Sequence, residues 1–123
     1  MSRERWRPVP GMKGYEASTH GRVRSNKRVP QADKNNPNSW RTLKAYTRVR
    51  GYLAIDIWSD DNTRKTVFLH QIIAQTFLDP VKGATDVDHK NYNRSDNSLA
   101  NLRFITREEN TSIAQKRRHA SNS

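Results

Sequence analysis

The sequence predicts an α+β fold, made of small antiparallel sheets with helices packed on them. Residues 52–58 alternate between apolar and polar side chains, which is typical of a half-buried strand. Residues 69–77 place apolar side chains at helical spacing, and residues 106–109 have a pattern that opens a helix. A chain of 123 residues with 33% hydrophobic content can build one core, and this length excludes a large multidomain enzyme.

The first predicted element is a short basic hairpin. The segment GYEASTHGRVRS at 14–25 indicates two extended pieces joined at His20 and Gly21, with Val23 directed inward. The following segment, 26–40, contains two prolines, four asparagines and few apolar residues, so we expect a long exposed loop that is disordered or becomes ordered on a ligand.

Positive charge is concentrated in this first part of the chain. The whole sequence has 23 Lys and Arg against 12 Asp and Glu, a formal net charge of +11. Residues 1–50 hold 13 of these bases against 3 acids, whereas residues 51–123 hold 10 against 9. A solubilising surface would explain some of this surplus, but a polyanionic partner explains it better. We therefore predict that 1–50 is a basic DNA-binding module, in which the phosphate-contacting candidates are Arg22, Arg24, Lys27 and Arg28.

The central elements are predicted to be a hairpin followed by a helix. Tyr52–Trp58 and Arg64–Phe68 form the two strands, and the turn residues 59–62 lie between them. The apolar stripe of the helix begins at Leu69 and continues to Phe77, and Asp79 and Pro80 terminate it. This helix is expected to pack on the sheet.

The last elements are predicted to be a second hairpin and a helix. Val87–His89 and Leu102–Thr106 are short extended runs separated by a polar loop. Thr106 and Glu109 match the capping box, so a helix should run from about Arg107 towards Arg118. Residues 119–123 are expected to be a disordered tail.

This second hairpin and helix bring together side chains that can bind a metal ion or accept a proton. Helical side chains tilt towards the helix N-terminus, so Asn110 can lean back over the strand that bears Asp88. A carboxylate and an amide oxygen suit Mg²⁺, or another hard ion such as Mn²⁺, which keeps open positions for substrate phosphate. His89 points to the opposite face of its strand, where it could take a proton from an attacking water.

The spacing of these residues resembles the motif of a known nuclease family. D-H-(x11)-N-L-(x7)-N, read on Asp88, His89, Asn101, Leu102 and Asn110, is similar to the HNH motif in its Asn-terminated form. Upstream, FLHQIIAQTF at 68–77 resembles the helix before the motif in phage and intron-encoded HNH enzymes, and GYEASTHGRVRS resembles their N-terminal module. The resemblance implies an HNH domain over 51–118, with a ββα-metal finger at 86–118.

The resemblance also implies roles for individual residues. Asp88 and Asn110 would be metal ligands, His89 the general base, and Asn101 the residue that braces the loop and orients His89. The reaction would be Mg²⁺-dependent hydrolysis of a DNA phosphodiester to a 5′-phosphate and a 3′-hydroxyl, with a nick as the product of a monomer. Cations of the finger are candidates for clamping the scissile phosphate of double-stranded DNA: Lys90, Arg94 and Arg103.

Two other classes of function remain open at this stage. A non-catalytic DNA-binding protein, such as a relic nuclease acting as a repressor or packaging accessory, needs the same basic half. An RNA-binding protein would explain the charge but not the register of the motif. The absence of cysteine excludes disulfides and Cys-based zinc sites, and no apolar stretch suggests export or a membrane span. We therefore expect the protein to be cytoplasmic, in the host cell if it is phage-encoded. We also expect it to be a monomer or a weak dimer.

Overall fold

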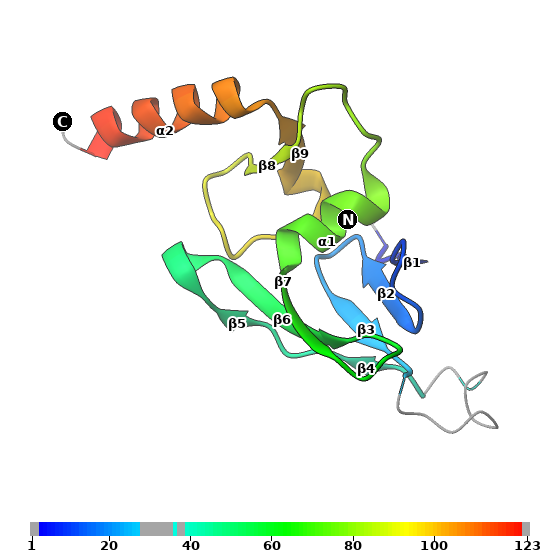
Figure 1. Cartoon of the computed structure of the whole chain (residues 1–123). Helices are drawn as coiled ribbons and strands as arrows, with labels where there is room; N and C mark the ends of the chain where they lie inside the picture. The colour runs from blue at the N-terminus through cyan, green and yellow to red at the C-terminus, as the bar shows by residue number, and fades with distance from the viewer. Residues whose placement is uncertain (1–2, 28–35, 37–38, 122–123) are drawn as a thin grey trace.

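The computed structural model describes residues 3–27, 36 and 39–121, with side chains described up to residue 116 (Figure 1). Over these residues the fold is α+β with three small antiparallel sheets, as the sequence predicts. Arg28 and most of the predicted loop 26–40 lie outside the described residues. The main elements follow in chain order: β1 (Trp6–Pro8), β2 (Tyr15–Ser18), β3 (Val23–Ser25), β4 (Arg41–Thr42), β5 (Tyr46–Thr47), η3 (Val49–Gly51), β6 (Leu53–Trp58), β7 (Arg64–Phe68), α1 (Leu69–Phe77), β8 (Asp86–His89), η4 (Leu99–Asn101), β9 (Leu102–Ile105) and α2 (Arg107–Ser121).

The N-terminal sheet has the strand order β1-β2-β3-β4 and contains the predicted basic hairpin. Its β2 and β3 strands pair with Ala17 opposite Val23, and both side chains are buried. Gly21 in the connecting turn has a φ of +84°, a conformation that glycine adopts without a steric cost. The predicted hairpin and the inward direction of Val23 are confirmed.

The second sheet has the order β5-β6-β7, and its longer hairpin is the predicted one. Ile55 and Ile57 of β6 are buried, as their alternation predicts. The sheet also includes β5, which lies in the segment assigned to the N-terminal module. Because β5 pairs with β6, this sheet contains residues from both predicted domains, 1–50 and 51–118. The division at residue 50 stays a prediction.

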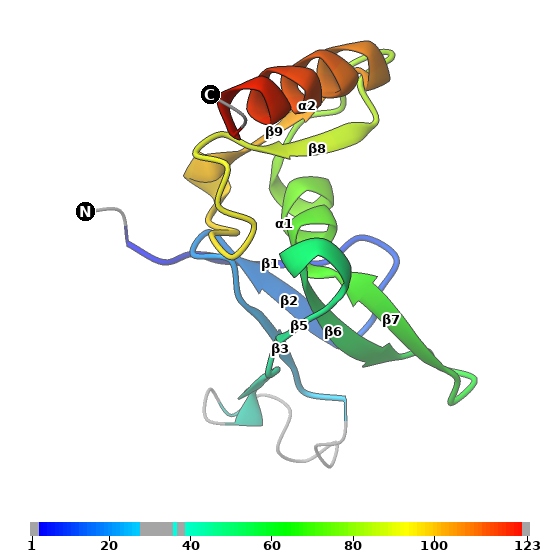
Figure 2. The same ribbon diagram turned by 90° about the vertical axis from the view of Figure 1, so that its left-hand side faces the viewer.

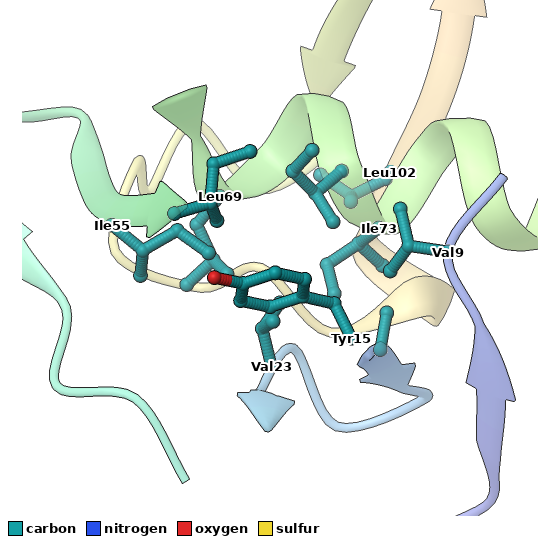
Figure 3. Close-up of a cluster of buried hydrophobic side chains, with 10 residues drawn as sticks. Val9, Tyr15, Val23, Ile55, Leu69, Ile73 and Leu102 are labelled. Carbon is teal, nitrogen blue, oxygen red and sulfur yellow. The ribbon is translucent and has the colours of Figure 1, made fainter. Parts of the chain in front are cut away.

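Helix α1 joins all three sheets, because it lies between the two larger sheets and the β8–β9 hairpin (Figures 1 and 2). Its buried side chains include Leu69, Ile72 and Ile73, at the spacing of the predicted stripe. The core around them takes residues from both ends of the chain, from Val9 to Leu102 (Figure 3). Within the described residues, no helix is long and apolar enough to cross a membrane.

The predicted finger forms from β8, β9 and α2, but α2 ends at Ser121 rather than near Arg118, so residues 119–121 of the predicted disordered tail are helical. Strand β8 pairs with β9 in a register that places Asp88 opposite Arg103. The capping box at the start of α2 is confirmed: the Glu109 backbone N–H donates to the Thr106 hydroxyl at 3.1 Å, and the Thr106 backbone N–H donates to the Glu109 carboxylate at 3.0 Å. This cap fixes the first turn of α2 against the hairpin.

The turn of the basic hairpin packs directly on the loop of the finger. The Leu99 backbone N–H donates to the Thr19 carbonyl at 2.9 Å. A Cβ atom added to Gly21 would lie 2.6 Å from the backbone carbon and oxygen of Asn97. This contact is too close for any side chain, so a glycine is required where the two parts meet.

Candidate functional site

The C-terminal end of β8 places two candidate residues on opposite faces of the strand. Asp88 and His89 are consecutive and both are 4% exposed. The Asp88 carboxylate faces Arg103, whose Nε donates to Oδ2 at 2.9 Å. His89 faces the other way, towards α1 and the start of β6, and contacts the rings of Tyr52 and His70. The prediction that Asp88 and His89 point to opposite faces of their strand is therefore confirmed.

One hydrogen bond fixes the imidazole of His89. Its Nε2 lies 2.8 Å from the Oδ1 of Asn97, a residue of the finger loop that is itself buried. An amide oxygen only accepts, so Nε2 carries the hydrogen and Nδ1 is the ring nitrogen that can take up a proton.

Asn101 makes the contacts of one of its two expected roles. Its amide bonds within the finger loop: Oδ1 accepts from the Asn91 backbone N–H at 3.0 Å, and Nδ2 donates to the Asn91 side chain at 2.9 Å and to the Asp96 carbonyl at 2.8 Å. Asn101 therefore braces the loop, as predicted. The hydrogen bond that orients His89 comes from Asn97 instead, because the loop turns the Asn97 side chain inward to the imidazole.

His70 supports His89 from α1. It is 6% exposed, its ring centroid lies 5.1 Å from that of His89 and 5.0 Å from that of Tyr52, and its Nδ1 has no hydrogen-bond partner. Burial, and to a lesser degree the neighbouring His89, lowers the pKa of His70 from 6.5 to about 4. His70 is therefore a neutral aromatic wall of the site at physiological pH.

Asn110 lies over β8 as predicted, but its direct partner is a different aspartate. Its Nδ2 donates to Asp86 Oδ2 at 3.0 Å, and Asp86 shares a strand face with Asp88 because the two are separated by one residue. The carboxylate and amide oxygens of this face have the hard-ligand chemistry of a Mg²⁺ site. Within the described residues, no group of three His, Cys, Asp or Glu side chains could hold a metal ion. A divalent ion here would therefore need ligands from water or substrate.

The cations of the basic hairpin already have acidic partners. Arg22 forms an ion pair with Glu4 and lowers the pKa of Glu4 to about 2. Arg24 lies 2.6 Å from a carboxylate oxygen of Glu16. Its guanidinium also lies over the rings of Trp6 and Trp40, 4.2 and 4.8 Å from their centroids. Lys27 lies 3.1 Å from Asp60.

The cations of the finger differ in their surroundings. Arg103 pairs with Asp88, as described above. The Arg94 guanidinium lies 4.6 Å over the ring of Tyr52 and donates a hydrogen bond to the Arg50 carbonyl. Lys90 is exposed. The DNA contacts proposed for these residues stay predictions.

Sequence reasoning misses three residues of the site: Asn97, Asp86 and Tyr52. Asp86 carries a weak signal, because it lies on the strand that bears Asp88 and His89. Tyr52 carries none, because neither η3 nor β6 bears a candidate residue. Asn97 is one of several asparagines in the segment KNYNRSDNSLAN, and nothing in the sequence distinguishes it from its neighbours.

Two family models match the chain, and together they cover most of it. The model described as the NUMOD4 motif matches residues 4–58, and the model described as HNH endonuclease matches residues 67–112. The boundary between them falls in the β6–β7 hairpin.

Two curated relatives are similar over most of this chain. The uncharacterized HNH endonuclease L245 of Acanthamoeba polyphaga mimivirus is 27% identical over 110 residues, which are 89% of this chain and 29% of the relative. The DNA endonuclease I-HmuI of Bacillus phage SP01 is 30% identical over 106 residues, which are 85% of this chain and 54% of the relative. The chain thus spans about half the length of the phage relative.

A solved structure has the same fold. The HNH homing endonuclease I-HmuI, described in terms of its DNA binding and cleavage, aligns with a TM-score of 0.72 at 28% identity, over 92% of this chain and 59% of that one. Because the chain contains the two family motifs one after the other and shares the fold of I-HmuI, it belongs to the HNH homing-endonuclease family and has a NUMOD4 module before its HNH segment.

Proposed function

We propose that this chain is a Mg²⁺-dependent DNA endonuclease that cuts one strand of duplex DNA with His89 as its general base. The observation that carries the proposal is the hydrogen bond from His89 Nε2 to Asn97, which leaves Nδ1 to accept a proton from water. His70 and Tyr52 restrict the ring further, so the base is held in one orientation before substrate arrives.

Asp88 and Asn110 are the proposed metal ligands, with Asp86 on the same face. Asp86 orients the Asn110 amide through the 3.0 Å hydrogen bond. These residues would hold a Mg²⁺ or Mn²⁺ ion, which would supply positive charge beside the leaving 3′ oxygen. The products would be a 5′-phosphate and a 3′-hydroxyl.

Arg103 has a defined place in this proposal. Its guanidinium neutralises the buried Asp88 carboxylate when no other cation does so, which avoids an unpaired buried charge. The Arg103 side chain is 49% exposed, so it can move without disturbing the core. If Asp88 held a divalent ion, Arg103 could leave Asp88 and bind a phosphate oxygen, and metal binding would then favour DNA binding.

DNA is the proposed partner because of the +11 charge and because I-HmuI, which shares the fold, is described as binding and cleaving DNA. One active site per chain gives a nick. Double-strand cleavage would need two chains acting on opposite strands.

The test is incubation of the purified protein with supercoiled plasmid in Mg²⁺, beside an EDTA control, with the products separated on a gel. We expect open circles that depend on Mg²⁺, are also formed in Mn²⁺, and are absent with His89→Ala. The matched control is His20→Ala, since the His20 side chain is 48% exposed and belongs to the N-terminal hairpin. Retained DNA binding without cleavage in any divalent ion would refute the proposal and favour a non-catalytic DNA-binding protein.

A further inference from the structure

Two loops from different parts of the chain meet beside His89. The η3 turn connects β5 to β6 and lies in the segment that matches NUMOD4, whereas the finger loop lies in the HNH segment. Arg94 of the finger loop joins them, because its guanidinium lies over Tyr52 and donates to the Arg50 carbonyl. Figure 1 shows the turn near the left edge of the molecule, below the finger loop.

Three of the cations on these two loops are exposed, whereas Arg94 is half-buried. Arg48, Arg50 and Lys90 are exposed, and none of the three forms an ion pair with any described residue. Arg22 and Arg24 of the basic hairpin are each held by a glutamate. Arg48, Arg50 and Lys90 are therefore freer to bind a phosphate than Arg22 and Arg24 of the basic hairpin.

The backbone of both loops is strained. Arg50 has a φ of 60° and Tyr92 a φ of 65°, and only one other described residue apart from glycine, Asn62, has a positive φ. Asn62 lies in a hairpin turn, where asparagine tolerates this conformation. An arginine and a tyrosine tolerate it poorly, and such strain is typical of functional surfaces.

The distance to His89 indicates which phosphates these cations would reach. The Tyr52 ring centroid lies 6.0 Å from that of His89, and the Arg94 guanidinium lies 4.6 Å over the same Tyr52 ring. Successive nucleotides of one strand advance by about 3.4 Å along the duplex axis. The η3 turn therefore lies within a few nucleotides of any phosphate that His89 can act on.

We propose that the η3 turn and the finger loop form one clamp on the DNA backbone, in which Arg48, Arg50 and Lys90 bind phosphates that flank the one to be cut. Arg94 is the positioning residue, because it holds the turn against the loop. The clamp rests on the proposed function for its ligand, duplex DNA. It means that the NUMOD4 segment contributes contacts beside the nuclease centre itself.

The test compares two double variants of equal charge. Arg48→Ala with Arg50→Asn removes two cations from the clamp, and asparagine keeps the left-handed backbone at position 50. Arg64→Ala with Lys65→Ala removes two exposed cations from the start of β7, at the other end of the same sheet. Duplex binding is measured by fluorescence anisotropy in EDTA over a series of salt concentrations, and thermal melting verifies that each variant is folded.

The clamp variant should show a smaller salt dependence. Each lost phosphate contact reduces the slope of log K against log[salt] by about 0.9, so the double variant should lose about two units and bind at least about tenfold more weakly at 0.1 M salt. The β7 variant should bind like the wild type. Equal slopes for the two variants would overturn the clamp, whether or not the wild type cuts DNA.

A second measurement locates the clamp relative to the cut. Once the nick is mapped, uncharged methylphosphonates replace phosphates one to three positions from it. Wild-type binding should weaken on this duplex, and the clamp variant should lose less than the wild type, because Lys90 is the one cation of the clamp that it keeps. A wild type that binds both duplexes equally, or a variant that shows the full wild-type loss, would refute this location. A wild type that binds but never nicks would refute the proposed function, and the anisotropy comparison would still decide whether the clamp exists.

Discussion

The buried imidazole of His70 should make the stability of this protein depend on pH. The pKa of His70 is about 4 in the folded chain, against 6.5 for an ordinary histidine, chiefly because burial disfavours the charged form. Between these two values the unfolded chain binds a proton that the folded chain does not. Stability should therefore fall as the pH drops from about 6.5 to about 4, and the contribution is constant above that window.

The size of the effect follows from the two pKa values. A shift from 6.5 to about 4 corresponds to about 3 kcal/mol once the pH is well below 4. Between pH 8 and pH 5, the loss in the free energy of unfolding is about 2 kcal/mol. That is a large part of the stability of a small domain.

The assay is urea unfolding followed by tryptophan fluorescence in EDTA, at pH 8 and pH 5. His70→Phe removes the titrating group but keeps an aromatic ring against Tyr52 and His89, and His70→Gln is a second neutral replacement. Both variants should lose about 2 kcal/mol less than the wild type on acidification, because the other ionisable groups are common to all three proteins. Parallel losses in the wild type and both variants would refute the reasoning.

Two further predictions concern the contact between the N-terminal hairpin and the finger loop. Gly21→Ala should lower the melting temperature more than Gly14→Ala, since both residues have a φ of +84° but only the Cβ at position 21 would clash with the Asn97 backbone, at 2.6 Å against a nearest contact of 3.4 Å at position 14. Equal losses would mean that the turn moves away from the loop at little cost. Asn97→Ala should reduce nicking by about 10- to 100-fold at unchanged duplex affinity, because His89 loses its orienting partner. The same change at Asn93, whose side chain accepts from the Ser95 backbone N–H, should affect nicking much less, and equal rates for the two variants would contradict the role of Asn97.

Local patterns predict most of the secondary structure because each element here has a strong local cause. The alternation in β6, the apolar stripe of α1 and the capping box of α2 each lie within a few consecutive residues. The motif spacing likewise brings Asp88 and Asn110 to the same side of the finger, although Asn110 bonds Asp86. The spacing alone does not say which carboxylate the amide meets, because both aspartates share that face.

The partner of His89 depends on the path of a loop, which short patterns do not describe. Asn97 and Asn101 are chemically identical and four residues apart, and either could reach an imidazole at the end of β8. The choice follows from the network of the finger loop, in which Asn101 bonds Asn91 and Asp96 and so cannot also face His89. Only the full set of loop hydrogen bonds identifies the orienting residue.

The strand register of the N-terminal hairpin indicates which of its cations have an acidic neighbour. Residues that pair across an antiparallel ladder lie side by side on one face, so Glu16 opposite Arg24 predicts an ion pair, as does Asp88 opposite Arg103. A cation already bound by a carboxylate gains less from a phosphate, because it must first lose its partner. The net charge of a segment therefore overstates its part in DNA binding wherever the register supplies an acid. The salt dependence of binding should come chiefly from turns and loops, where no strand lies opposite to provide one.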